Sequence, residues 1–252
     1  MIYPGLAGRI ALVTGGSRGI GAACCRELAQ SGARVALTYR QDRAGAESVV
    51  DAIEQSGGNA IAIAADVSDA EAVGHAVAKV RSHWGDIELL VNNAGIFEVV
   101  SHEETTLEQW RRMLDVNLTG VYLTTWAVKP AMIASNYGRI VNVASIAGLR
   151  ARPTCIAYAV SKAGVIALTK SLSEAVAKAG VRVNAVAPGL IDTEMISGFA
   201  EEGRQALVDA TPIQRLGTPE EIAATVMFLL SDLSSFTTGQ TYTVSGGRVL
   251  LP

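Results

Sequence analysis

Tyr158 and Lys162 are the first residues whose types and spacing suggest chemistry. They stand four positions apart in a segment with a helical pattern, so their side chains share one face of that helix. A free tyrosine has a pKa of about 10 and is a poor acid–base catalyst at neutral pH. A nearby ammonium stabilises the phenolate and lowers that pKa. Because such a pair also arises by chance in helices, it needs support from other residues.

Ser145 supplies part of that support, since it ends the preceding predicted strand, thirteen residues before Tyr158. A serine hydroxyl at that point is suited to hydrogen-bond a substrate oxygen whose charge changes during hydride transfer. The three side chains together predict acid–base chemistry at an oxygen, next to a group that carries hydride.

A glycine-rich turn near the N-terminus is the candidate site for that group. Gly15, Gly19 and Gly21 follow a predicted strand and open a predicted helix. Glycine lets the backbone approach a pyrophosphate closely, and a helix N-terminus offers free N–H groups and a positive dipole end. The turn therefore predicts dinucleotide binding, with a plain structural turn as the alternative.

The end of the second predicted strand bears on which dinucleotide is bound. NAD-binding folds usually place a carboxylate there, for the ribose 2′-hydroxyl. Residues 37–40 instead read Leu-Thr-Tyr-Arg, and the first acid is Asp42. A guanidinium pairs with a 2′-phosphate that an acid would repel. Arg40, with Arg18 from the glycine-rich turn, predicts NADP(H); two solvated arginines are the alternative.

Short apolar strands alternate with helical segments along the whole chain. The predicted strands span 9–14, 34–39, 60–65, 88–92, 139–144, 181–187 and 240–244. The predicted helices span 19–31, 44–55, 69–84, 107–135 with a kink near Pro130, 156–178 and 219–230. This alternation predicts an α/β single-domain, doubly wound Rossmann fold over 1–252, with a seven-stranded parallel sheet and helices on both faces. Ligands of such sheets bind beyond the carboxyl ends of the strands.

Composition excludes several other classes of function. The 252 residues carry a net charge of −3 and no run of Lys or Arg, which argues against nucleic-acid binding. No apolar run approaches the roughly 18 residues that span a bilayer. The three cysteines and three histidines follow no disulfide or metal-ligand pattern, so we expect no metal. Without a basic leader or cleavage signal, we expect a cytoplasmic protein.

Taken together, these features resemble the short-chain dehydrogenase/reductase family from end to end. The matching motifs, in chain order, are 14–21, 92–95, Asn117, Ser145, Tyr158 with Lys162, and 188–193. Residues 138–142, 181–189 and 215–223 look most like the 3-oxoacyl-[acyl-carrier-protein] reductase branch. Two segments depart from that branch: Ser245 replaces a usual Asp before two glycines, and residues 96–100 are unlike those of the fatty-acid-synthesis reductases.

The resemblance implies a role for each matching residue. Tyr158 would give a proton to the carbonyl, and Ser145 would orient the substrate oxygen. Lys162 would hold the nicotinamide ribose and lower the tyrosine pKa, while Asn117 would position a water that links Lys162 to solvent. The implied cofactor-binding set is Gly15, Ser17, Arg18, Gly19, Ile20, Gly21, Tyr39, Arg40, Asp66, Val67, Asn93, Ala94, Gly95, Tyr158, Lys162, Pro188, Gly189, Ile191 and Thr193.

Within that set the resemblance assigns places along the cofactor. Asp66 and Val67 would contact the adenine. The adenosine ribose would lie against Asn93, Ala94 and Gly95. The nicotinamide carboxamide would be seated by Pro188, Gly189, Ile191 and Thr193.

The expected activity is that of an NADPH-dependent ketoreductase acting on a 3-oxoacyl thioester, as in fatty acid biosynthesis. One alternative is an NADP-linked dehydrogenase of a sugar or secondary alcohol, because the same residues catalyse the reverse reaction. Another is a non-catalytic NADP(H)-binding regulator, although a sensor would not need a proton donor. We expect a small-molecule or acyl-thioester substrate, no nucleic-acid or membrane partner, and a homotetramer. We also expect a substrate-covering loop insertion over 190–211, with Met195, Gly198, Phe199 and Gly203; a surface helix and turn is the alternative for this segment.

Overall fold

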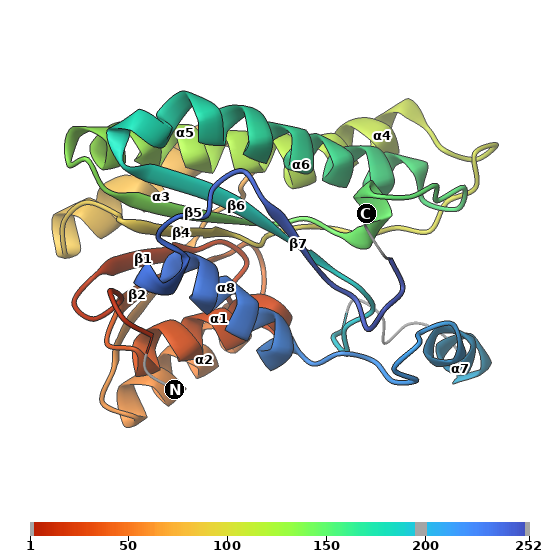
Figure 1. Cartoon of the computed structure of the whole chain (residues 1–252), viewed down its shortest axis with the longest axis horizontal. Helices are drawn as coiled ribbons and strands as arrows, with labels where there is room; N and C mark the ends of the chain where they lie inside the picture. The colour runs from red at the N-terminus through yellow and green to blue at the C-terminus, as the bar shows by residue number, and fades with distance from the viewer. Residues whose placement is uncertain (1–2, 195–200, 250–252) are drawn as a thin grey trace.

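A single parallel sheet forms the centre of the computed structural model, which describes residues 3–194 and 201–249 (Figure 1). Its order is β3-β2-β1-β4-β5-β6-β7, so the strand order reverses between β1 and β4. The strands are β1 Ile10–Val13, β2 Arg34–Tyr39, β3 Asn59–Ala64, β4 Leu89–Asn92, β5 Gly138–Val143, β6 Val181–Pro188 and β7 Thr241–Val244. The predicted seven-stranded parallel sheet is confirmed, with small differences at the strand ends.

Two layers of helices cover the sheet, with α3, α5 and α6 above it and α1, α2 and α8 below it in Figure 1. The helices are α1 Gly19–Gln30, α2 Arg43–Gln55, α3 Ala70–His83, α4 Leu107–Leu114, α5 Gly120–Ala134, α6 Ile156–Val176, α7 Glu201–Asp209 and α8 Pro219–Leu230. Helix α7 stands apart from both layers, at the right of the view. The doubly wound Rossmann architecture predicted from the alternation is therefore confirmed.

Alternate side chains of each strand enter opposite hydrophobic cores, as the pleat requires. In β1, Ala11 and Val13 pack with α1, α2 and α8, whereas Ile10 and Leu12 pack with α3, α5 and α6. The strand is buried on both faces, which explains why it is a continuous apolar run. The sheet thus holds its carboxyl ends in fixed positions for the site.

Local signals set several helix starts. Thr106 and Gln109 form a capping box at α4, in which each side chain accepts a hydrogen bond from the other's backbone N–H. Thr218 and Glu221 do the same at α8, where Pro219 takes the first helical position.

The predicted helix over 107–135 is not one continuous α-helix. Its regular geometry is interrupted by a π-helical turn at Asp115–Thr119, and α5 then runs through Pro130 to Ala134. The change in helical geometry therefore comes fifteen residues or so before the expected kink. Such turns insert one residue into the helical repeat and often lie at functional sites.

The predicted loop over 190–211 is not a loop throughout, because α7 occupies Glu201–Asp209. Gly203 lies in that helix, while Met195, Gly198 and Phe199 fall outside the described residues. Over the described ranges, none of the helices is long and apolar enough to cross a membrane. The same ranges hold no group of three or more His, Cys, Asp or Glu placed to bind a metal ion.

Candidate active site

Tyr158, Lys162 and Ser145 meet beyond the carboxyl end of β5. Ser145 follows this strand, and its hydroxyl accepts a 3.1 Å hydrogen bond from the Ala147 N–H. Tyr158 lies in the first turn of α6, with Lys162 one turn later. The Lys162 Nζ donates to the Val143 carbonyl at 2.8 Å and lies 5.8 Å from the Tyr158 ring centroid. The structure therefore brings together the three side chains that the sequence singled out.

Burial dominates the electrostatics of this cluster. It raises the pKa of Tyr158, against a smaller lowering by the hydrogen bond with Ser145. It also lowers the pKa of Lys162 to about 8. The net shift of the Tyr158 pKa is thus opposite to the one expected from the ammonium alone, and the phenol is held protonated at neutral pH.

Asn117 occupies the π-helical turn and is fully buried. Its Oδ1 accepts from the Ile96 N–H at 2.8 Å, and its Nδ2 donates to the Ile96 carbonyl at 2.9 Å. A Cβ placed on Gly95 would lie 3.2 Å from Asn117 Oδ1 and 3.6 Å from Lys162 Nζ. Asn117 therefore lies near Lys162 and fixes the chain after β4, and its side chain does not face solvent.

Phe97 is a site residue that the sequence did not single out. Its ring meets the Tyr158 ring edge-on, with centroids 4.9 Å apart and planes at 78°. It lies in the segment 96–100, whose difference from the fatty-acid-synthesis reductases was the available signal. Phe97 thus forms an apolar wall against the phenol.

The glycine-rich turn is shaped by contacts that leave no space for side chains. Gly15 adopts a φ of +64°, and a Cβ there would lie 2.9 Å from the Ala94 Cα. A Cβ on Gly21 would overlap the Gly15 carbonyl oxygen. Arg18 is the N-cap residue of α1, and no side chain from the described residues caps the first turn. The backbone N–H groups of this first helical turn are therefore available to an anion.

Asn93 fixes this turn to the neighbouring strand β4. Its Nδ2 donates to the carbonyls of Thr14 and Gly15 at 3.0 and 2.8 Å. In return the Thr14 Oγ1 accepts from the N–H groups of Asn93 and Ala94 at 3.0 and 3.1 Å. Asn93 therefore shapes the switch point between β1 and β4 through the backbone of the turn.

Arg40 lies at the carboxyl end of β2 and Asp66 just beyond β3, so neighbouring strands bring them together. Arg40 Nη1 is 3.7 Å from Asp66 Oδ2. Burial raises the Asp66 pKa, but hydrogen bonds from Ser68 and the charge of Arg40 outweigh it, and the net pKa is lowered. Val67 is buried against Gly120 of α5, and Tyr39 packs partly against the core. Arg18 is exposed.

The segment after β6 crosses over to the glycine-rich turn. Pro188 ends the strand, and Gly189 lies so close to Ser245 that a Cβ would be 2.7 Å from the Ser245 Cα. Ile191 is buried, and a Cβ on Gly19 would meet the Thr193 Cγ2 at 3.2 Å. The residues expected at the two ends of a dinucleotide therefore line one continuous edge of the sheet; Ser17 and Ile20, half-buried, lie in the same turn.

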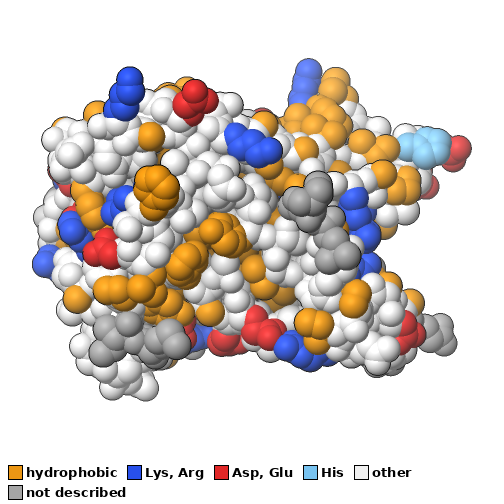
Figure 2. All heavy atoms as spheres, in the orientation of Figure 1, with side chains coloured by type: hydrophobic (Ala, Val, Ile, Leu, Met, Phe, Trp, Pro, Cys, Tyr) orange, Lys and Arg blue, Asp and Glu red, His pale blue; other side chains and the backbone are white. Residues whose placement is uncertain are grey.

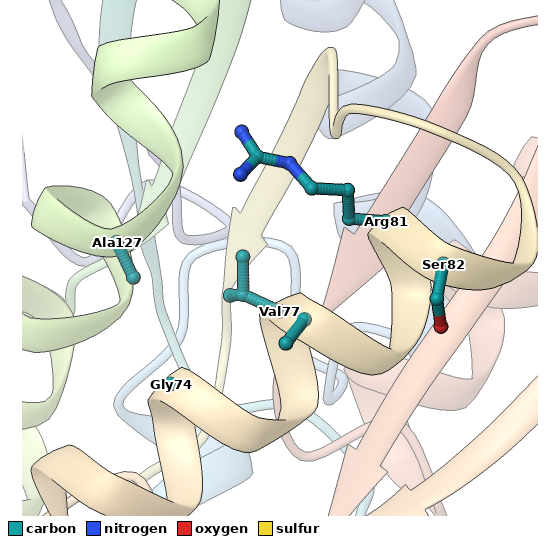
Figure 3. Close-up of a pocket in the computed structure, with 6 residues that line it drawn as sticks. Gly74, Val77, Arg81, Ser82 and Ala127 are labelled. Carbon is teal, nitrogen blue, oxygen red and sulfur yellow. The ribbon is translucent and has the colours of Figure 1, made fainter.

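A hollow of about 330 Å³ lies elsewhere on the described surface, between α3 and α5 (Figure 3). Figure 3 shows Val77 and Ala127 facing it from the two helices. Arg81 lines it too, but none of the catalytic candidates does. The hollow is lined by small and apolar side chains with few polar groups, so it is not the site of the chemistry.

Comparison with known proteins gives the same class of protein as the fold and the site. A family model described as enoyl-(acyl carrier protein) reductase matches residues 15–248. A 3-oxoacyl-[acyl-carrier-protein] reductase of Synechocystis sp. is 42% identical over 246 residues, which are 97% of this chain and 98% of the relative. Glucose 1-dehydrogenase 2 of Bacillus subtilis is 37% identical over 255 residues, and the match covers 100% of this chain and 98% of the relative.

Solved structures agree with these sequence relatives. A dehydrogenase/reductase from Sinorhizobium meliloti superposes with a TM-score of 0.90 at 36% identity, over 97% of this chain and 96% of that one. The chain belongs to the short-chain dehydrogenase/reductase family. It is an oxidoreductase acting on CH–OH groups, and membership of the family implies a nicotinamide cofactor.

Proposed function

We propose that this protein is an NADPH-dependent ketoreductase whose substrate is a 3-oxoacyl thioester. The observation that carries the proposal is the half-buried Tyr158, whose phenol is hydrogen-bonded to Ser145 and which lies one helical turn from Lys162. A protonated phenol beside a serine hydroxyl suits a reaction that ends with a proton on a substrate oxygen. The relative from Synechocystis, a 3-oxoacyl-[acyl-carrier-protein] reductase, supports the substrate class.

The cofactor that we propose for this site is a phosphorylated dinucleotide. Gly15 and Gly21 leave room for a pyrophosphate where a Cβ would not fit, and the uncapped start of α1 offers N–H groups. Arg40 and Arg18 supply positive charge near the end of β2 for a 2′-phosphate, with Asp66 and Val67 beside the adenine. Asn93, Ala94 and Gly95 would line the adenosine ribose, and Pro188, Gly189, Ile191 and Thr193 the carboxamide.

In the reaction, Tyr158 donates its proton to the carbonyl oxygen while Ser145 holds that oxygen by a hydrogen bond. The chemistry that NADPH would supply, when bound, is the hydride for the carbonyl carbon. Lys162, fixed by the Val143 carbonyl, would hold the nicotinamide ribose and would carry positive charge near the phenolate that forms. Asn117, next to Lys162, would orient a water that returns a proton from solvent.

The remainder of the chain supports this activity in our proposal. Residues 1–252 form one domain, of which 190–211 covers the substrate. Tyr122 and Trp126 of α5 and Val160 of α6 expose large apolar surfaces, as expected if these helices meet other subunits of a homotetramer. We place the protein in the cytoplasm, in a reductive step of fatty acid biosynthesis.

An NADP-linked dehydrogenase of a sugar or secondary alcohol is the second candidate. The glucose 1-dehydrogenase relative, nearly as similar as the reductase, favours it. The same side chains would then act in reverse, with Tyr158 as the base that takes the hydroxyl proton.

Turnover with a panel of substrates separates these candidates. We expect NADPH-dependent reduction of an acetoacetyl thioester at a rate well above that with NADH. Oxidation of glucose or simple alcohols alone would assign the second candidate. Tight NADPH binding without turnover of any carbonyl or alcohol would contradict both and favour a sensor.

A further inference from the structure

Phe97 lies against the Tyr158 ring, although the proposed reaction gives it no role. Its ring meets the phenol ring edge-on, with centroids 4.9 Å apart and planes at 78°. This edge-to-face arrangement is a favourable aromatic contact. Both side chains are half-buried, so each keeps part of its surface accessible. The contact therefore places a phenyl group beside the space that a substrate of Tyr158 has to enter.

The chain that leads to Phe97 first passes the other polar groups of the site. A Cβ on Gly95 would lie 3.2 Å from the Asn117 Oδ1 and 3.6 Å from the Lys162 Nζ. Two residues later the chain reaches the Tyr158 ring. Lys162 and Tyr158 lie one turn apart on α6, so residues 95–97 follow the face of α6 that carries both. Phe97 is thus on the side of the helix where the chemistry takes place.

Contacts on both sides of Phe97 hold its segment in place. Before it, Asn117 exchanges two hydrogen bonds with the backbone of Ile96, at 2.8 and 2.9 Å. After it, Glu98 forms an ion pair with Arg112 of α4, with 3.0 Å between Oε1 and Nη1. The backbone of Phe97 is therefore fixed between the π-helical turn and α4.

The far end of the segment is attached to the start of α6, among apolar side chains. The Val100 N–H donates to the Thr154 carbonyl at 3.0 Å, two residues before that helix begins. Val99 and Ile156 are 57% and 40% exposed. Figure 2 shows hydrophobic side chains gathered between the regions of α4 and α6 in Figure 1. The segment that carries Phe97 is thus anchored at both ends and bordered by apolar groups.

The phenyl ring offers a substrate only apolar contact. A hydroxyl group pressed against it would lose hydrogen bonds with water and gain none in return. A methyl or methylene group would instead be removed from water, which is favourable. In the proposed reaction the hydroxyls of Tyr158 and Ser145 are both directed to the carbonyl oxygen. An alkyl group next to the carbonyl is therefore the substituent that suits Phe97.

We propose that Phe97 is a specificity-determining residue against which the alkyl end of the substrate lies, so that the enzyme rejects compounds with a hydroxyl group next to the carbonyl. The inference rests on the proposed function, because it concerns the substrate of the same site. A 3-oxoacyl thioester carries a hydrocarbon group on one side of its ketone, while the other side leads to the thioester. A sugar carries hydroxyl groups on the carbons beside its reacting carbon.

Two ketones that differ by one hydroxyl test the proposal. Acetoacetyl-N-acetylcysteamine and its 4-hydroxy derivative are compared by kcat/KM for NADPH oxidation. We expect the wild type to prefer the unsubstituted ketone by about tenfold to a hundredfold, the range in which a hydrophobic pocket discriminates against an added hydroxyl. Phe97→Ser should reduce that preference by about tenfold. Phe97→Leu, which keeps an apolar wall without the ring, should retain it.

Phe236→Ser is the matched control, because Phe236 is fully exposed and follows Ser235, which accepts a hydrogen bond from Arg182 at the start of β6, away from the site. It should leave the ratio unchanged. A general loss of order in Phe97→Ser would lower kcat/KM for both ketones alike, so the ratio isolates the role of the ring. Phe97→Thr repeats the test if Phe97→Ser does not fold. A wild type without preference, or a wild-type ratio in the polar variants, would overturn the proposal.

A pair of alcohols keeps this test separate from the proposed function. Cyclohexanol and myo-inositol carry hydrogens and hydroxyls, respectively, on the carbons beside the carbinol, and both are offered with NADP+. If only alcohols are turned over, the proposed function fails. The role of Phe97 then stands if the wild type prefers cyclohexanol and Phe97→Ser reduces that preference by about tenfold.

Binding replaces turnover if none of these compounds reacts. The two ketones are then titrated by calorimetry in the presence of NADP+, which cannot reduce them, and their Kd values should show the same ratio. Equal turnover of both ketones would refute the role of Phe97 and leave the ketoreductase assignment in place. Failure of both ketones and both alcohols to react or bind would overturn the assignment and the role of Phe97 together.

Discussion

The two ends of the active site are built differently. At the glycine-rich turn, backbone meets backbone: Gly15 lies against Ala94, and Asn93 binds the carbonyls of Thr14 and Gly15. At the substrate end, Tyr158 is surrounded by side chains instead. The Phe97 ring meets the Tyr158 ring edge-on, and the Ser145 side chain is hydrogen-bonded to the phenol.

This difference reflects the different requirements of cofactor binding and substrate binding. A pyrophosphate needs close backbone approach and fixed N–H groups, which only a narrow set of residues permits. A substrate pocket is defined by replaceable side chains on loops, so one scaffold can accept different substrates. The 3-oxoacyl-carrier-protein reductase and glucose dehydrogenase relatives, similar over nearly the whole chain, fit that contrast.

The largest effect is expected from Tyr158→Phe, which should abolish turnover at the substrate end and leave NADPH binding at the cofactor end intact. Removing the phenolic hydroxyl removes the proton donor, so kcat should fall by roughly 10²–10⁴-fold. The Kd for NADPH, measured by fluorescence titration, should change little because the glycine-rich turn is untouched. Loss of NADPH binding instead would show that Tyr158 supports the fold of the cofactor end.

Gly21→Ala should damage the opposite end. The added Cβ would overlap the Gly15 carbonyl and approach Asn93, so we expect the free energy of unfolding to fall by about 1–3 kcal/mol and NADPH binding to weaken. Gly74→Ala is the matched control, because a Cβ on this α3 glycine has nothing within 4 Å. Chemical denaturation of both variants checks this; equal stabilities would contradict the close packing of the turn.

Arg40→Asp sharpens the comparison within the cofactor end. It replaces a partner for a 2′-phosphate by a group that repels it, next to Asp66. The ratio of kcat/KM with NADPH to that with NADH should fall roughly tenfold to a hundredfold. Arg43→Asp, at an exposed arginine paired with Glu47, should change the ratio far less. An unaltered ratio in Arg40→Asp would exclude this arginine from the phosphate site.

The smallest expected effect is the pH dependence of kcat/KM that the ionisation of Lys162 would cause. Burial lowers its pKa to about 8, so the ammonium is charged below that pH and neutral above it. The Tyr158 phenol stays protonated across this range because its own pKa is raised. The kcat/KM for ketone reduction should therefore be level below pH 8, half-maximal near it and lower above. A profile that stays flat to about pH 10 would argue against a charged Lys162 in the reaction.

Nearly all of the fold could be predicted from the sequence alone. The β-α alternation identified every strand, because parallel strands covered on both faces must be continuous apolar runs. It could not detect the π-helical turn at Asp115–Thr119, since one inserted residue barely disturbs an apolar pattern. Helix α7 lies in a stretch of mixed glycine, acidic and apolar residues for which a loop was preferred and a surface helix was only the alternative.

For the site, the order and spacing of Ser145, Tyr158 and Lys162 determined the class of chemistry, because residues on one helix turn and one strand end have few ways to meet. The direction of the Tyr158 pKa was decided by tertiary burial, which spacing does not reveal. The contact of Phe97 with the Tyr158 ring was decided by the tertiary structure too, because the two residues come from distant segments of the chain. Local spacing identified the candidate catalytic residues of this protein, whereas long-range packing decided their burial and their neighbours.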